Sequence, residues 1–206
     1  MSAEMIRDNA LKVSGLLVPK IGGKSVYPYQ PDDLWNLSDK KWRYRYQHDI
    51  GENLYRRSLY TFWKRSAPPP SMIIFDTPNR DLCSVKRTLT SSPLQALILL
   101  NDPQYVEAAR VMAENSILHE DENIYKKLGI IFRKITGRLV SKRELETLQK
   151  FYIEEKEKFS KNPKKAFNYL TTGEKPINGK AGVIRTAALA TVIIGLMNTA
   201  EAITIN

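Results

Sequence analysis

The chain has 206 residues and a composition ordinary for a globular protein, so it is long enough for one domain with a sizeable core. Its formal net charge of +10 favours acidic partners, but the basic residues are dispersed, and we do not expect nucleic acid as a specific partner. A single cysteine excludes an intramolecular disulfide, two isolated histidines argue against a metal site, and no apolar run approaches the roughly 20 residues of a membrane span.

Apolar residues near the N-terminus recur at helical spacing, at Ile6, Ala10, Val13 and Leu17. This period predicts an amphipathic helix over residues 2–14. Gly15 is expected to end the helix, because glycine adopts the left-handed conformation that closes many helices.

Residues 20–90 form an aromatic and proline-rich segment that we expect to be irregular and partly extended. Aromatic and β-branched residues favour a strand at residues 58–63, and an apolar run indicates a second possible strand at residues 72–76. The triple proline at residues 68–70 favours a stiff polyproline segment between them.

One part of this segment alternates aromatic and basic residues, in the order Trp42, Arg43, Tyr44, Arg45 and Tyr46. The alternation indicates a short strand with an aromatic face and a basic face. The aromatic face either packs on the core or stacks on a polyanion, such as a sulfated glycan or a single-stranded nucleic acid.

Residues 91–206 carry repeated helix-start signals. Ser92-Pro93, Asp102-Pro103 and Asn162-Pro163 each pair a capping residue with a proline at the first helical position, and Ser141 with Glu144 forms a capping box. Gly137 is expected to end one of these helices. These signals predict a helical bundle.

The apolar residues of the bundle recur at helical spacing and are expected to face its core. They are Leu94, Leu97, Ile98, Val106, Ala109, Ala113, Ile117, Ile124, Leu128, Ile131, Ile135, Leu145, Leu148, Tyr152, Phe159, Phe167 and Leu170. The last predicted helix, residues 183–203, is apolar on most sides and should lie buried. The fold class is therefore mainly α: a single domain over residues 1–206, with a helix at 1–19, the aromatic segment at 20–90 and the bundle at 91–206.

A candidate ligand site follows the triple proline, where short polar side chains and several cations converge on one loop. Its residues are Arg57, Asp76, Asn79, Arg80, Cys83, Lys86 and Arg87. Such groups could hold a carboxylate or sulfate. Alternatively, Asp76 and Asn79 cap turns and Arg80 pairs with an acid. Cys83 is either a small buried residue, the interpretation we favour, or a nucleophile activated by the neighbouring cations.

The segment RRSLYTFWKRSAPPPSMIIFDTPNRDLCSVKR, followed by TSSPLQALILLNDPQYVEAAR, resembles the planctomycete-type secreted domain known as domain of unknown function 1553. SAEMIRDNALKVSGLL before it and AALATVIIGLMNTAEAIT after it extend the resemblance over essentially the whole chain. TSSPLQAL stands where the family tends to have TNTPLQAL. The chain resembles only the C-terminal half of the family domain, so we expect it to be a fragment.

The resemblance implies an exported parent protein, periplasmic or extracellular, in which a cytochrome-c-type domain precedes this one. The chain contains no CxxCH and no export signal, so haem c is expected only in a full-length parent. The family supplies no established activity. Three hypotheses follow: a non-catalytic module that docks to the cytochrome-c-type domain or the N-terminal half of the family domain, part of an enzyme acting on extracellular polysaccharide or a redox substrate, or a polyanion binder.

Overall fold

The computed structural model describes residues 1–31, 34–35, 46–80, 83–87, 89–118 and 123–204. Helices dominate, and none of these residues belongs to a β-strand, which confirms the mainly α fold class. The chain divides into two compact units, of which unit 1 comprises Met1–Asn9 and Leu17–Ile98 and unit 2 comprises Ala10–Leu16 and Leu99–Asn206. The single domain over residues 1–206 stays a prediction.

Helix α1 (Ala3–Ser14) forms close to the predicted bounds and contributes residues to both units. Gly15 ends it with φ +82°. The Leu16 N–H donates to the Leu11 carbonyl at 2.9 Å and the Gly15 N–H donates to the Lys12 carbonyl at 3.2 Å. This pair of bonds is the Schellman closure of a helix, and it requires the left-handed residue that glycine provides.

Unit 1 consists mainly of loops with short helical turns. They are η1 (Gly51–Tyr55) and η2 (Ser58–Tyr60), both 3-10 helices, then α3 (Pro70–Ile74) and the first part of α4 (Pro93–Asn101). The predicted strands at residues 58–63 and 72–76 are wrong. A strand needs a paired neighbour, and the segment meets one only through an isolated bridge between Val26 and Thr61. Pro70 instead starts α3, because its fixed φ suits the first position of a helix.

An aromatic cluster forms the core of unit 1. Trp35 and Tyr46 are buried at 6% and 7% exposure, and Tyr27 and Phe62 pack against them. Tyr27 and Phe62 stack with ring centroids 5.0 Å apart. Burial raises the pKa of Tyr46, whose hydroxyl donates to the Pro28 carbonyl. Tyr46 thus faces the core, whereas residues 42–45 of the predicted aromatic strand lie outside the described part of the chain.

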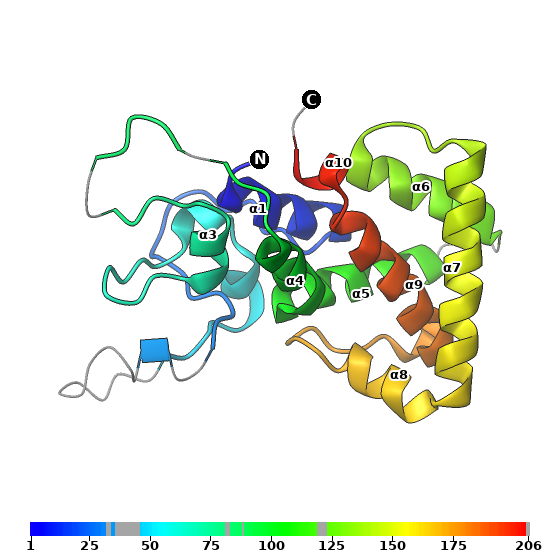
Figure 1. Ribbon diagram of the computed structural model, residues 1–206. Helices are drawn as coiled ribbons and strands as arrows, with labels where there is room; N and C mark the ends of the chain where they lie inside the picture. Colours follow the sequence, from blue (N-terminus) through cyan, green and yellow to red (C-terminus); the bar gives the residue numbers. More distant parts are fainter. Residues whose placement is uncertain (32–33, 36–45, 81–82, 88, 119–122, 205–206) are drawn as a thin grey trace. The chain divides into compact units, whose positions relative to one another are not determined.

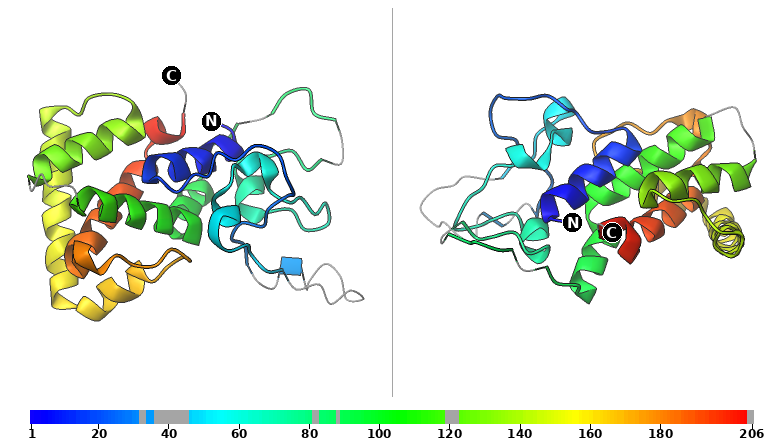
Figure 2. Two further views of the ribbon diagram at one scale, coloured as in Figure 1. Left: turned by 180° about the vertical axis from the view of Figure 1, so that it is seen from behind. Right: turned by 90° about the horizontal axis from the view of Figure 1, so that it is seen from above.

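Unit 2 is a helical bundle arranged around α9 (Figures 1 and 2). Its helices are α5 (Pro103–Leu118), α6 (Ile124–Thr136), α7 (Lys142–Lys161), α8 (Pro163–Leu170), α9 (Val183–Met197) and α10 (Ala200–Ile203), with the 3-10 turn η3 (Gly179–Ala181) before α9. Helix α9 packs against α5, α7 and α8 and is buried on most sides, as predicted. The single helix expected at residues 183–203 ends at Met197, and α10 follows as a separate turn.

The predicted caps of the bundle are confirmed. Ser141 and Glu144 form a reciprocal capping box at the start of α7. The Asn162 side chain accepts a hydrogen bond from the Lys165 N–H at 3.1 Å and so caps α8. Gly137 ends α6 with φ +80°. These contacts are local in sequence, which is why the sequence alone predicts them.

The predicted buried face holds for most of its residues on α5 and α6 and for Leu170 on α8, but it is wrong for Leu94 and Leu97 on α4 and for Phe167 on α8. Leu94 and Leu97 are 51% and 55% exposed, and Phe167 is 51% exposed. On α4 the buried residues are Gln95 and Leu99. Gln95 turns inward because its side-chain Nε2 donates to the Ile74 carbonyl at 2.8 Å, which places the leucines beside it on the outer face.

Candidate functional site

The predicted site loop begins at Asp76, whose carboxylate is held from the far end of the loop. The backbone N–H and the hydroxyl of Thr90 donate to Asp76 Oδ2 at 2.7 and 2.8 Å. Gln95 Nε2 also donates to the Thr90 hydroxyl oxygen at 3.2 Å and lies 3.5 Å from Asp76 Oδ2. Asp76 therefore joins the two ends of the loop. This resembles the turn-capping role expected for Asp76, but its partner lies 14 residues away in the sequence.

Two residues of this loop have left-handed backbone conformations that side chains disfavour. Asp76 has φ +60° and Arg80 has φ +62°. The bonds from Thr90 hold Asp76 in this conformation. The Arg80 guanidinium lies over the Trp63 ring, 4.5 Å from its centroid, in a cation–π contact. The acid expected to pair with Arg80 is not found among the described residues.

Arg87 and Arg57 pair with acidic residues of α1. Arg87 Nη1 lies 2.7 Å from Glu4 Oε2, and Arg57 Nε lies 3.4 Å from Asp8 Oδ2. Burial opposes ionisation of Glu4, but the hydrogen bond from Arg87 and those from its neighbours outweigh burial and lower the pKa of Glu4. Exposed pairs of this kind stabilise a fold only slightly, so their main effect is to position the two arginines.

The remaining site residues, Asn79, Cys83 and Lys86, are exposed. The favoured interpretation of Cys83 as a small buried residue is therefore wrong. Nothing packs over residues 83–87 tightly enough to exclude water from the thiol. The structure brings Asp76 together with Thr90 and Gln95, but it holds each predicted arginine against a different partner. Whether the loop binds a ligand stays a prediction.

Arg7 and Arg56, which the sequence did not single out, organise the loops of unit 1. Arg7 is 4% exposed and donates from Nη1 to the Arg56 carbonyl at 2.9 Å and from Nη2 to the Leu54 carbonyl at 2.8 Å. Arg56 in turn donates to the carbonyls of Lys20, Gly22 and Lys24. Both arginines lie in segments that carry the family resemblance, but neither belongs to a periodic pattern, and their partners are loop carbonyls that sequence spacing does not indicate.

A second missed cluster lies inside unit 2, on α5. Arg110 is fully buried, with Glu114 Oε1 2.9 Å from its Nη1 and Glu107 Oε1 3.6 Å from its Nη2. Glu107 and Glu114 are themselves 1% and 4% exposed. The spacing of three and four residues places all three side chains on one helix face. That spacing within an otherwise apolar helix is the signal that could have identified the cluster.

The loop at residues 173–178, which we name the strap, covers this cluster with backbone atoms. Arg110 Nη2 donates to the Lys175 carbonyl at 2.6 Å, the Lys175 N–H donates to Glu107 Oε1 at 2.6 Å, and the Asn178 N–H donates to Glu114 Oε1 at 3.3 Å. At Gly173, which has φ +93°, a Cβ atom would lie 2.4 Å from Glu107 Cδ. Only glycine fits there.

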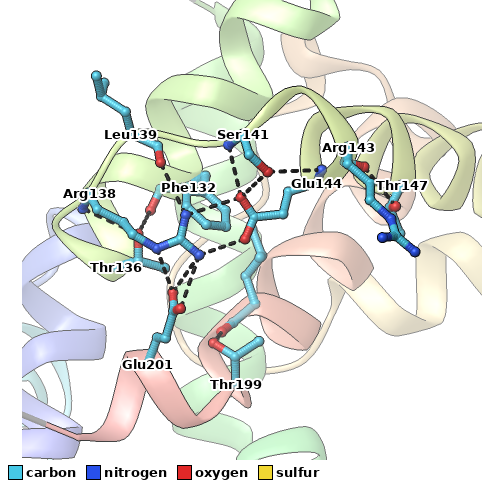
Figure 3. Close-up of polar contacts among 11 residues, drawn as sticks. Phe132, Thr136, Arg138, Leu139, Ser141, Arg143, Glu144, Thr147, Thr199 and Glu201 are labelled. Atoms are coloured by element: carbon cyan, nitrogen blue, oxygen red, sulfur yellow. Dashed lines mark hydrogen bonds and ion pairs between the residues drawn. The ribbon is translucent and has the colours of Figure 1, made fainter.

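A third charged cluster surrounds Arg138 at the turn between α6 and α7 (Figure 3). Its guanidinium donates to both carboxylate oxygens of Glu144, at 3.0 and 2.5 Å, and to Glu201 of α10, and it lies over the Phe132 ring. Hydrogen bonds from Arg138 and Ser141 lower the pKa of Glu144 to about 2. Arg138 thus links α10, through Glu201, to the first turn of α7, through Glu144.

Residues 1–152 match the model of a protein family described as PSD1, protein of unknown function (DUF1553). The match covers unit 1, the α5 cluster and the Arg138 turn. The chain belongs to the DUF1553 family. Neither the curated proteins nor the solved structures contain a match to it.

Within the described part of this DUF1553 chain, no group of three His, Cys, Asp or Glu side chains could hold a metal ion. No described helix combines the length and apolar character needed to cross a membrane. The buried charges of the family member pair with one another or with backbone groups, and these contacts join distant segments. The arrangement is suited to holding loops in place.

Proposed function

We propose that this chain is a non-catalytic docking module and that its partner is another part of the same exported parent protein. The resemblance to the planctomycete-type secreted domain supports this setting, periplasmic or extracellular, and supplies two partners. The first is the N-terminal half of the family domain, and the second is a cytochrome-c-type domain.

The observation that carries the proposal is an exposed apolar face on α4. Leu94, Leu97 and Leu100 are 51%, 55% and 41% exposed, and we name them the α4 leucine face. Their spacing of three residues places them on one side of the helix. Leu89, which precedes the helix, is 65% exposed. Adjacent exposed leucines of this kind are typical of a protein–protein contact.

The α4 leucine face is preorganised for docking. The inward hydrogen bonds of Gln95, from Nε2 to the Ile74 carbonyl and to Thr90, fix the rotation of α4. The helix therefore loses little conformational freedom when a partner binds. The net charge of +10 favours a partner with an apolar stripe and an acidic rim.

The test is a calorimetric titration of the chain with each proposed partner, the N-terminal half of the family domain and the cytochrome-c-type domain, purified separately. The double variant Leu94→Glu/Leu97→Glu should weaken binding about tenfold or more, because it places two charges in an apolar contact. Both side chains are exposed, so the fold should persist. Circular dichroism checks that it does.

The matched control is Ile130→Glu on α6, which is 55% exposed and adds the same kind of charge away from α4. It should bind as the wild type does. The proposal fails if the wild-type chain binds neither partner, or if the α4 variant and the α6 control bind equally well.

An enzymatic role for the loop at residues 76–87 is the second candidate. The observation that favours it is the left-handed backbone of Asp76 and Arg80, because strained residues often occur at functional sites. The substrate would be an extracellular polysaccharide or a redox compound. Turnover that is lost in Arg80→Ala, with an unchanged melting temperature, would support this role. Wild-type protein that is inactive on such substrates would dismiss it.

A further inference from the structure

A hollow of about 660 Å³ lies in unit 2, where α1 and α5 end and α6 passes beside them. It is lined by Lys12, Val13, Ser14, Gly15, Met112, Asn115, Ser116, Leu118 and Lys134. The volume falls in the range of small-molecule sites, which is about 300–1,000 Å³. The lining comes from the end of α1 with Gly15 and from the consecutive helices α5 and α6, so the hollow is a product of the packing of unit 2.

Two lysine residues line the hollow, Lys12 in the last turn of α1 and Lys134 in the last turn of α6. Within the described part of the chain neither forms an ion pair. A lysine near a helix C-terminus commonly serves the exposed carbonyls there. The question is therefore whether the carbonyls at these helix ends need the two lysines.

At each of these helix ends at least one carbonyl already has another donor. On α1, the Ser14 carbonyl accepts from Asn115 Nδ2 at 3.2 Å, which adds to the Schellman bonds that close the helix. On α5, the Ile117 carbonyl accepts from Lys127 Nζ at 3.2 Å. On α6, the Gly137 N–H donates to the Arg133 carbonyl at 2.9 Å. The ammonium groups of Lys12 and Lys134 are therefore available to bind an anionic ligand.

The rest of the wall is mixed. Val13, Met112 and Leu118 provide apolar surface. The Ser116 hydroxyl donates to the Met112 carbonyl at 2.7 Å, so its oxygen can still accept a hydrogen bond. A site with an apolar side and two cations at its rim complements a small molecule that has a charged head and an apolar tail.

We propose that this hollow is a binding site for a small amphipathic organic anion, such as a carboxylate with an aliphatic or aromatic tail. The lysine ammonium groups bind the carboxylate, and the Val13 and Leu118 side chains contact the tail. The site is distinct from the α4 leucine face and does not depend on the docking proposal.

The experiment is a calorimetric titration of the full chain with three probes: decanoate, decanol and acetate. Decanoate should bind saturably and at least tenfold more tightly than decanol, which keeps the tail, or acetate, which keeps the head. Lys12→Met/Lys134→Met should weaken decanoate binding about tenfold or more and leave decanol binding unchanged. Ser116→Trp, which fills the hollow, should weaken both.

The control variant Lys142→Met/Lys164→Met removes two lysines from exposed positions on α7 and α8 and changes the net charge equally. It should bind decanoate as the wild type does. Equal weakening in the control and in Lys12→Met/Lys134→Met would show that only the overall charge matters, and the proposal would be overturned. Absence of saturable decanoate binding, or decanoate binding that Ser116→Trp does not weaken, would overturn it as well. Thermal unfolding of each variant verifies that it is folded.

Discussion

Replacing Arg110 by methionine tests whether the buried cluster on α5 holds unit 2 together. The substitution keeps the volume of the side chain roughly but leaves Glu107 and Glu114 buried, at 1% and 4% exposure, without their cation. It also removes the hydrogen bond to the Lys175 carbonyl at 2.6 Å. Breaking a buried ion pair by removing one partner costs about 3–5 kcal/mol. With a urea m-value of about 2 kcal/mol/M, the unfolding midpoint should fall by about 2 M.

The assay is urea unfolding followed by far-ultraviolet circular dichroism. Helical signal is the suitable probe because the two tryptophans among the described residues, Trp35 and Trp63, belong to unit 1 and not to unit 2. Hydrogen exchange adds a local measurement: the Lys175 and Asn178 amides donate to the two carboxylates, so they should lose protection in Arg110→Met.

The triple variant Glu107→Gln/Arg110→Met/Glu114→Gln is the control for charge. It removes both buried carboxylates together with the cation, so part of the lost stability should return. If Arg110→Met lowers the free energy of unfolding by less than about 1 kcal/mol and the strap amides stay protected from exchange, the cluster does not stabilise unit 2 in the way inferred here.

Three further results are expected. Gly173→Ala should destabilise unit 2 by about 1–3 kcal/mol, because the new methyl group would overlap Glu107 and the left-handed backbone would be strained; an unchanged urea midpoint would contradict this. The pKa of Glu144 is lowered to about 2 from an unfolded value near 4.5, so its stabilising effect is complete above pH 4.5 and lost as the pH falls towards 2. Arg138→Met should therefore show a weaker loss of stability between pH 4.5 and 2 than the wild type, and identical pH profiles of the two proteins would contradict this role of Arg138. The exposed Cys83 should react with a thiol reagent in the native protein at a rate close to that of the unfolded chain.

The sequence predicted the helices of unit 2 well because their signals are local. Ser141 with Glu144 and Asn162 before Pro163 act within one helical turn, so no distant contact is needed to recognise them. The same is true of Gly15, which ends α1 through bonds to the turn that precedes it.

The errors fall where distant contacts decide the structure. The aromatic segment at residues 58–63 has strand propensity, but Arg7 takes the carbonyls beside it and no neighbouring strand forms. On α4, Gln95 is buried because the Ile74 carbonyl lies opposite it, and this rotates Leu94 outward. Neither the Arg7 contacts nor the Gln95 contact can be recognised from the local pattern of apolar residues.

The predicted site residues also illustrate this limit. Charge and proximity in sequence grouped three arginines into one predicted site. In the structure Arg57 pairs with Asp8, Arg80 lies over the Trp63 ring and Arg87 pairs with Glu4, and sequence spacing reveals none of these partners. The buried acids and arginine of α5 carried a helical spacing that was available from the sequence. The apolar stripe of the same helix, Val106, Ala109 and Ala113, predicts its buried face without reference to these charged residues.

The strap reaches the α5 cluster through main-chain atoms, the carbonyl and N–H of Lys175 and the N–H of Asn178. Main-chain contacts do not depend on the identity of the side chain, and the Lys175 side chain is exposed. The loop can therefore accept many substitutions over evolution while the interior it covers cannot. Proline at residue 175 or 178 would remove a donor, and any side chain at residue 173 would overlap Glu107, so these substitutions are exceptions. A loop of variable sequence that keeps this glycine is expected among relatives that share the Glu107, Arg110 and Glu114 cluster.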